Sequence, residues 1–335
     1  MNRDNEILFV GALGRMEMEK IPAAGYKIIG LDIRGLQRKV TLSNLSFPFK
    51  VISSVSKSKK IIKDFKPDAA VGVGGYASGP LLWAATSYKI PAIIQEQNSF
   101  PGITNRMLAK RVQKICVAYE GMEKFFPAKN IIMTGNPVRQ DIAATTGKEA
   151  RAMDFFGLNK DKKTLLVIGG SLGARTINES LAGEIEKLNA AGIQLIWQTG
   201  KYYFEKAKTF ASGTIKVFDF IKEMDLAYAA ADAVISRAGA LSVSELCLVG
   251  KPVIFVPSPN VTADHQTKNA MTLVEKDAAL MVRDAEARQK LVDQALLLMQ
   301  DGERLKTLRH NISALAKKES AKKIAEIIYD LVEEK

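Results

Sequence analysis

The chain has 335 residues, of which 47% are apolar and 25% charged, and its formal net charge is +12. This balance is typical of a soluble globular protein and excludes disorder or coiled coil as the main architecture. Two cysteines are too few for a disulfide framework or a four-cysteine zinc site. No apolar run reaches the roughly 20 residues that span a bilayer.

The positive charge is concentrated in the first 140 residues. This part holds 21 Lys and Arg against 10 Asp and Glu, whereas the remainder holds 27 against 26. A basic half indicates an anionic partner, such as a nucleic acid, an acidic membrane surface or phosphate groups. A lysine-rich surface that serves only solubility is the alternative.

Short apolar runs alternate with helical segments along the chain, the pattern of an α/β fold. Continuous apolar strands such as residues 164–168 indicate parallel sheets that are covered on both faces. Two successive sets predict two doubly wound domains, residues 1–140 and 141–335. The predicted strands are 6–10, 26–31, 69–73, 92–95, 114–117 and 131–134, then 164–168, 194–198, 215–218, 233–236, 253–256 and 280–282.

The first glycine-rich turn, GVGGYASGP at residues 72–80, follows a predicted strand and opens a helix. Glycines let the backbone approach a ligand, and a helix N-terminus offers free N–H groups to an anion. The segment also matches a dinucleotide fingerprint, Gly72-x-Gly74-x-x-Ala77, with Glu96 about twenty residues further on. A tight strand–helix turn without a ligand is the structural alternative.

A second turn, GGSLGAR at residues 169–175, has the same arrangement in the other domain, and Ser171 could donate its hydroxyl to a phosphate. A third, SRAGALSVSE at residues 236–245, places Glu245 about one turn into a helix. A carboxylate there could accept two ribose hydroxyls or could complement the helix dipole. These turns predict a ligand at the carboxyl ends of the strands.

The segment DHQTKN at residues 264–269 gathers hydrogen-bonding groups suited to sugar hydroxyls, although Asp264 could instead cap a helix. The chain has two histidines, His265 and His310, and His310 is predicted to lie on the surface. No cluster of His, Cys or carboxylate residues has the spacing of metal ligands. We therefore expect neither a metal nor a cofactor.

Six segments together resemble the MurG family of peptidoglycan N-acetylglucosaminyltransferases, in the family order and with similar spacing. They are residues 72–80, 95–106, 134–139, 169–175, 236–245 and 264–270. The resemblance covers most of the chain. It implies a GT-B fold, in which two Rossmann-like domains face each other across a cleft and the last helix crosses back to the first domain.

The resemblance also implies an activity. It is the inverting transfer of N-acetylglucosamine from UDP-N-acetylglucosamine to lipid I, a polyprenyl-diphosphoryl muramoyl-pentapeptide, to form lipid II at the cytoplasmic face of the cell membrane. Nucleic acid is not an implied partner. For UDP-N-acetylglucosamine the implied ligands are Asn98, Arg139, Ser171, Ile221 through its backbone, Ala240, Leu241, Ser242, Glu245 and Gln266. For the acceptor diphosphate they are Gly74, Gly75 and Tyr76.

The N-terminus departs from the family pattern. The resemblance implies a first strand, a Gly-Gly-Thr-Gly-Gly-His loop and a helix before the strand at residues 6–10, roughly thirty residues that this sequence lacks. The proposed base histidine belongs to that loop, so no catalytic residue is assigned here. A non-catalytic UDP-sugar-binding homologue is therefore an alternative, and an NAD-dependent oxidoreductase is a third.

Residues 49–66 predict an amphipathic helix. At 100° per residue one stripe holds Val51, Ile52, Val55, Ile62 and Phe65, while Lys50, Lys57, Lys60 and Lys63 fall on the other side. Packing on the chain's own sheet would explain the stripe. The family resemblance instead implies an exposed apolar patch at Phe49, Ile52 and Val55, which predicts peripheral binding to an anionic membrane surface.

Overall fold

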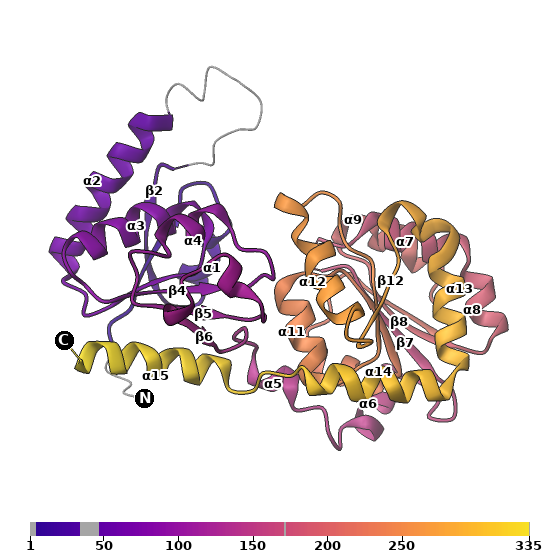
Figure 1. Ribbon diagram of the computed structural model, residues 1–335. Coiled ribbons are helices and arrows are strands. Elements are labelled where there is room, and N and C mark those ends of the chain that lie inside the picture. The colour runs from indigo at the N-terminus through magenta and orange to yellow at the C-terminus, as the bar shows by residue number, and fades with distance from the viewer. Residues whose placement is uncertain (1–4, 34–46, 171, 335) are drawn as a thin grey trace. The chain divides into compact units, whose positions relative to one another are not determined.

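The computed structural model describes residues 5–33, 47–170 and 172–334 (Figure 1). These residues form two compact units, each built on parallel β-structure. The N-terminal unit comprises the described residues up to Gly135 and the chain from Lys322 onward; the C-terminal unit is Asn136–Ala321. The boundary therefore lies near the predicted division after residue 140, and most of the last helix belongs to the first unit.

The strands of the N-terminal unit form two parallel sheets. Strand β1 (Leu8–Ala12) pairs with β2 (Lys27–Leu31). A separate sheet has the order β3-β4-β5-β6, formed by Ala70–Gly72, Ala92–Glu96, Lys114–Val117 and Ile131–Met133. Each predicted strand is present: β5 has the predicted ends, and the other five differ by one or two residues at an end. Within the described residues, β1, β2, β3 and β6 each have one edge without a strand partner.

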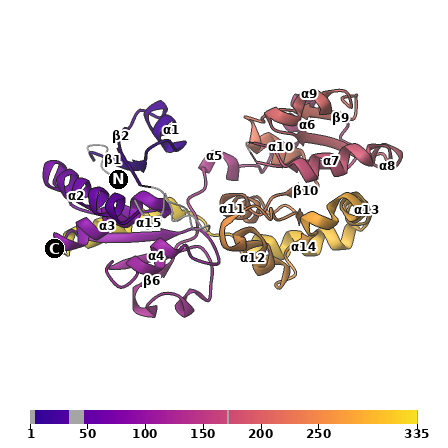
Figure 2. The same ribbon diagram turned by 90° about the horizontal axis from the view of Figure 1, so that it is seen from above.

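Helices cover these sheets (Figures 1 and 2). The sheet of β1 and β2 packs through Ala12 and Leu31 in a cluster that includes Ile61 and Ala77, from the helices α2 and α3. The last helix packs beside β4 and β5 through Ile324 and neighbouring apolar residues. The helices are α1 (Glu17–Ala23), α2 (Phe47–Phe65), α3 (Gly75–Ser87), α4 (Ile103–Leu108) and α15 (Ser320–Glu333), with 3₁₀ turns at Met122–Lys124 and Ala128–Asn130.

The amphipathic helix predicted at residues 49–66 is present as α2. Phe49 and Ile52 are exposed, as the family resemblance implies, whereas Val55 is only partly exposed. Ile52 is 67% exposed, whereas Ser54 and Ser58 are buried together with Ile61 and Ile62. Small serine side chains let α2 pack closely against its neighbours, so packing rather than hydrophobicity alone decides the buried face. Lys50, which was predicted on the basic side of this helix, is partly buried and forms an ion pair with Asp32.

The C-terminal unit holds one six-stranded parallel sheet with the order β12-β11-β10-β7-β8-β9. All six predicted strands are confirmed, four of them with the predicted ends. They are β7 (Thr164–Ile168), β8 (Gln194–Gln198), β9 (Ile215–Phe218), β10 (Ala233–Ser236), β11 (Val253–Phe255) and β12 (Leu280–Met281). Its central strand β7 is buried along its whole length, as expected for a sheet with helices on both faces.

The helices of this unit follow the strands in alternation. Glycines in the left-handed conformation end two of them, Gly157 after α6 and Gly250 after α11. The helices are α5 (Gln140–Ala143), α6 (Glu149–Phe156), α7 (Arg175–Gly183), α8 (Ile185–Ala190), α9 (Lys201–Lys208), α10 (Met224–Ala230), α11 (Ala240–Val249), α12 (His265–Val274), α13 (Ala287–Gln300) and α14 (Gly302–Ala314), with 3₁₀ turns at Thr262–Asp264 and Asp284–Glu286.

Candidate functional site

The turns after β7 and β8 approach each other so closely that both need glycine. A Cβ on Gly173 would lie 2.0 Å from the carbonyl oxygen of Thr199, and one on Gly200 would lie 2.3 Å from the Gly173 nitrogen. Both glycines also have a positive φ, +79° and +75°. Because the strands are parallel, these turns lie at the carboxyl edge of the sheet, where open α/β sheets bind ligands.

Gln198, at the end of β8, holds two more segments of this edge in place. Its side chain is buried; Nε2 donates to the carbonyl oxygen of Gly170 at 3.3 Å, and Oε1 accepts from the backbone N–H of Ile221 at 3.0 Å. The family resemblance implies that the backbone of Ile221 contacts the base of the UDP nucleotide. The Ile221 N–H is already engaged, so such a contact would use the carbonyl oxygen or displace Gln198.

The third turn leads into α11. Gly239 occupies the N-cap position, so Ala240, Leu241 and Ser242 form the first helical turn rather than a free turn. The N–H groups of a first turn have no acceptor within the helix and lie at the positive end of its dipole. The Leu241 side chain is 50% exposed. This end of α11 is thus suited to an anionic ligand.

The loop before α11 is fixed by side chains from elsewhere in the same unit. Arg237 donates through Nη1 to the carbonyl oxygen of Val256 at 2.9 Å and pairs with Asp284 at 2.5 Å. Asn269 donates to the carbonyl oxygen of Ala238 at 3.3 Å. Both arginine and aspartate are largely shielded from solvent, so the pair is held in a less polar environment than a surface pair.

Glu245 lies one turn into α11, as predicted, and is partly buried. Its Oε2 accepts a hydrogen bond from the hydroxyl of Tyr228, on α10, at 3.3 Å. Burial raises the pKa of Glu245, while the Tyr228 hydrogen bond and the positive charge of Arg139 oppose this increase. Glu245, Tyr228 and Arg139 therefore form one electrostatic group, in which Arg139 is largely exposed.

Gln266 lies in the first turn of α12, where its Oε1 accepts from the backbone N–H of Ser258 at 2.8 Å. Asp264 occupies the N-cap position in a left-handed conformation and makes no capping hydrogen bond through its side chain. The predicted phosphate ligand Ser171 lies outside the described residues.

The glycine-rich turn of the N-terminal unit also opens a helix. Gly74 is the N-cap of α3 and Gly75 its first residue, with φ of +86° and +76°. Tyr76 is 44% exposed, and the Arg15 guanidinium lies 5.7 Å from the centre of its ring. A basic group and free helix N–H groups thus meet at the turn predicted to bind a diphosphate.

Glu96, at the end of β4, is the centre of a hydrogen-bond network that the sequence did not predict. The carboxylate is buried and accepts from the N–H and Nδ2 of Asn98, the N–H of Gly102 and Nδ2 of Asn105, at 2.8 to 3.3 Å. Both carboxylate oxygens accept hydrogen bonds from the protein itself. Glu96 therefore does not serve as the acidic residue that binds the ribose in a dinucleotide fingerprint. An acidic residue after an apolar strand was the only signal in the sequence.

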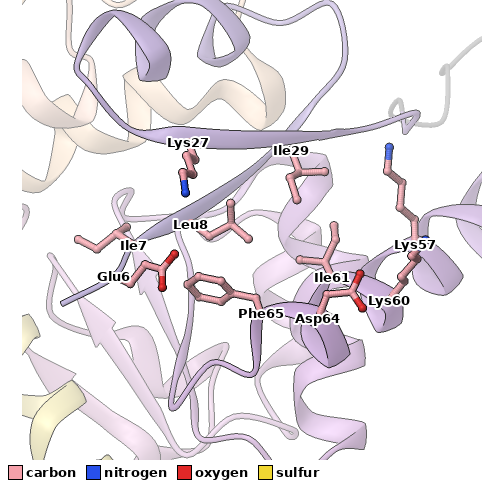
Figure 3. Close-up of a pocket in the computed structure, with 10 residues that line it drawn as sticks. All are labelled: Glu6, Ile7, Leu8, Lys27, Ile29, Lys57, Lys60, Ile61, Asp64 and Phe65. Atoms are coloured by element: carbon pink, nitrogen blue, oxygen red, sulfur yellow. The ribbon is translucent and has the colours of Figure 1, made fainter.

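A separate cavity of about 430 Å³ lies between the β1–β2 sheet and α2 (Figure 3). None of its lining residues belongs to the predicted site. Lys57 lines it and donates through Nζ to the carbonyl oxygen of Gly30. The lining residues are Glu6, Ile7, Leu8, Lys27, Ile29, Lys57, Lys60, Ile61, Asp64 and Phe65.

Neither a metal-binding cluster nor a membrane-spanning helix is found in the described part of the chain. Among those residues, no group of three or more His, Cys, Asp or Glu side chains is arranged to hold a metal ion. Within the described helices there is no stretch with the length and hydropathy of a membrane-spanning segment.

Family models match both units. The glycosyltransferase family 28 N-terminal domain matches residues 1–117 and the C-terminal domain of that family matches residues 164–327. A crystal structure of Acinetobacter baumannii MurG is 27% identical, with a TM-score of 0.76 over 97% of this chain and 91% of that chain.

Curated relatives are more similar still. The UDP-N-acetylglucosamine–N-acetylmuramyl-(pentapeptide) pyrophosphoryl-undecaprenol N-acetylglucosamine transferase of Parabacteroides distasonis is 56% identical over 99% of this chain and 91% of its own length. The enzyme of the same name from Cytophaga hutchinsonii is 56% identical over 98% of this chain and 89% of its own length. With its two parallel-sheet units and these relatives, the chain belongs to the MurG family of GT-B glycosyltransferases.

Proposed function

We propose that this chain transfers N-acetylglucosamine from UDP-N-acetylglucosamine to lipid I, forming lipid II in peptidoglycan synthesis. The observation that carries the donor assignment is the position of Glu245, one turn into α11 and beside the free N–H groups of Ala240, Leu241 and Ser242. A carboxylate can accept both hydroxyls of a ribose, while the helix N-terminus stabilises the diphosphate that follows it. Arg139 adds positive charge near the same group.

The reaction is an attack by the acceptor hydroxyl on the anomeric carbon of the sugar. The acceptor oxygen bonds to that carbon, and its proton passes to a general base, for which no residue of this chain is assigned. The bond from the carbon to the diphosphate oxygen breaks, UDP leaves, and the configuration at the carbon is inverted. Negative charge develops on the departing diphosphate. Preorganised N–H groups and a positive side chain stabilise such charge without reorganising during the reaction, which is usually the largest single contribution to catalysis.

The remaining assignments extend this proposal to both substrates. Gln266 binds the sugar through the amide Nε2, since its Oε1 is engaged by Ser258. Asn98 is a second proposed sugar ligand. In the N-terminal unit, Gly74, Gly75 and Tyr76 bind the acceptor diphosphate at the N-terminus of α3, with the Arg15 cation beside the tyrosine ring.

The lipid acceptor requires the enzyme to work at a membrane, and we propose that α2 supplies the contact at the cytoplasmic face. Phe49 and Ile52 are 75% and 67% exposed on this helix, and Lys60 and Lys63 are exposed further along it. Aromatic and aliphatic side chains can enter the lipid boundary while lysines approach anionic headgroups. This combination supports peripheral binding to an anionic bilayer.

A UDP-sugar-binding protein without transferase activity is a second candidate. Both histidines of the sequence, His265 and His310, fall in the C-terminal unit, and the family resemblance places its base histidine in a loop of the other domain. Binding of the donor without transfer to an acceptor distinguishes this candidate from the transferase.

Calorimetric titration with UDP-N-acetylglucosamine tests the donor site. Glu245→Ala is expected to weaken binding by about 1.5–3 kcal/mol, the scale for hydrogen bonds to a charged group. The matched control Glu303→Ala removes an exposed glutamate on α14 and is expected to leave the affinity unchanged. Equal affinities of the Glu245→Ala variant and the unaltered chain would reject the assignment.

A further inference from the structure

Tyr228 and Glu245 lie on different helices, α10 and α11, and meet inside the C-terminal unit. Tyr228 has no solvent exposure, and its hydroxyl donates to Oε2 of Glu245 at 3.3 Å. Tyrosine hydroxyls that are buried usually find a hydrogen-bond partner, because an unpartnered one carries a desolvation cost. Here the partner is the carboxylate assigned to the ribose.

We propose that Tyr228 is a positioning residue for nucleotide binding, because its hydroxyl holds the Glu245 carboxylate in the orientation that accepts the ribose hydroxyls. The inference rests on the proposed function, from which the ribose contact of Glu245 comes. Tyr228 touches neither the nucleotide nor the sugar in this account and acts only through Glu245.

The chemistry of the pair supports this role. A carboxylate has about four acceptor positions on its two oxygens, so one bond from Tyr228 leaves enough for two ribose hydroxyls. A carboxylate held in one orientation before the ligand arrives loses less conformational entropy on binding than a mobile one. Burial and the negative charge of Glu245 raise the pKa of Tyr228 well above its ordinary value, so the hydroxyl keeps its proton and remains a donor.

Tyr203 provides a matched control. Its hydroxyl is also buried, on α9 of the same unit, and it has no hydrogen-bond partner among the described residues. Tyr203→Phe and Tyr228→Phe therefore remove the same atom from two shielded sites, but only Tyr228→Phe removes a hydrogen bond to Glu245.

The experiment is calorimetric titration of each variant with UDP and with 2′,3′-dideoxy-UDP, which lacks the ribose hydroxyls. Tyr228→Phe is expected to weaken UDP binding about tenfold, as expected for a lost hydrogen bond to a charged group, and to leave 2′,3′-dideoxy-UDP binding unchanged. Tyr203→Phe is expected to change neither. In a Glu245→Ala background, which leaves no side-chain oxygen for Tyr228 to hold, Tyr228→Phe is expected to have no further effect on UDP binding.

Three results would overturn the inference. Equal losses for UDP and 2′,3′-dideoxy-UDP in Tyr228→Phe would indicate a structural role alone, and unchanged UDP binding would indicate no role. Full additivity of Tyr228→Phe and Glu245→Ala would show that Tyr228 does not act through Glu245. Absence of UDP binding by the unaltered chain would instead reject the proposed function itself, so the two failures are distinguishable.

Discussion

The side-chain Oε1 of Gln266 accepts a hydrogen bond from the backbone N–H of Ser258 at 2.8 Å, which ties the start of α12 to the loop after β11. This bond assigns the two ends of the amide: the oxygen faces the protein backbone, and Nε2 is the end that can donate to a ligand. A glutamine held by one end is a more selective sugar ligand than a free one, because its orientation is fixed before binding.

Gln266→Ala is expected to weaken the binding of UDP-N-acetylglucosamine by about 0.5–1.5 kcal/mol, the range for a neutral hydrogen bond, and to affect UDP less. The reason is that the proposed contact is with the sugar, which UDP lacks. Calorimetry with both ligands measures the difference. Equal losses for UDP and UDP-N-acetylglucosamine would assign Gln266 to the nucleotide or to the fold of the loop.

The pH dependence of UDP binding follows from the raised pKa of Glu245. The ionised carboxylate accepts the ribose hydroxyls, and because its pKa lies above the ordinary glutamate value of about 4.3, protonation begins at a higher pH than usual. As the pH falls, affinity is therefore expected to begin to decrease at a pH above the range in which an ordinary glutamate is protonated. The terminal phosphate of UDP also titrates, near pH 6, and this affects both proteins equally. Glu245→Gln is therefore the control, because it lacks only the carboxylate. Identical pH profiles for the two proteins would contradict this expectation.

Membrane binding is expected to depend on both the apolar and the basic residues of α2. The double change Phe49→Ser and Ile52→Ser should weaken co-sedimentation with anionic vesicles. Each apolar side chain that leaves water for the lipid contributes about 1.5–3 kcal/mol to binding. Lys60→Glu with Lys63→Glu should weaken it too, at about 1 kcal/mol for each lysine near the surface. Binding should decrease as salt shortens the Debye length.

Leu297→Ser is the control for that experiment, because Leu297 is also a largely exposed apolar residue, 61% accessible, on α13 of the other unit. It should leave vesicle binding unchanged. The same loss in this control as in the Phe49 and Ile52 variant, or equal binding to neutral and anionic vesicles, would show that α2 is not the membrane contact.

Two glycines separate the cost of a left-handed backbone from the cost of a close approach. Gly192 has a φ of +68° and open space where a Cβ would lie, whereas Gly173 has a φ of +79° and a Thr199 carbonyl oxygen 2.0 Å from that position. Gly192→Ala is expected to lower the free energy of unfolding by about 1–2 kcal/mol. Gly173→Ala should cost about 1–3 kcal/mol more. Similar values from denaturant unfolding would contradict this account of the turn.

The strands could be predicted from the sequence because apolar runs such as Thr164–Ile168 are buried on both faces of the sheet. Local hydrophobicity and burial in the fold therefore agree. The position of Glu245 about one turn into a helix was also predicted correctly, since spacing within a helix is a local property. Helical periodicity alone did not decide which face of α2 is buried. Ser54 and Ser58 are buried, whereas Ile52 is exposed, as the family resemblance implied. Which face of a helix packs inward depends on the partners that the fold brings to it.

The contacts that organise the site were beyond the sequence for the same reason. Tyr228 and Glu245 are 17 positions apart on separate helices, and only the packing of α10 against its neighbours brings them within hydrogen-bond distance. The bond from the Ile221 N–H to Gln198 joins the end of β8 to the segment after β9, 23 positions further along the chain. Such pairs carry no periodic pattern, so a motif can identify one partner but not the other.

Transfer of labelled N-acetylglucosamine from UDP-N-acetylglucosamine to a lipid I analogue tests the central claim most directly. The assay compares this chain with a version to which the N-terminal strand, loop and helix of a family member have been added. Transfer by the extended version, reduced by Glu245→Ala, is the expected result. Binding of UDP-N-acetylglucosamine by the extended version without any transfer to the acceptor would contradict it.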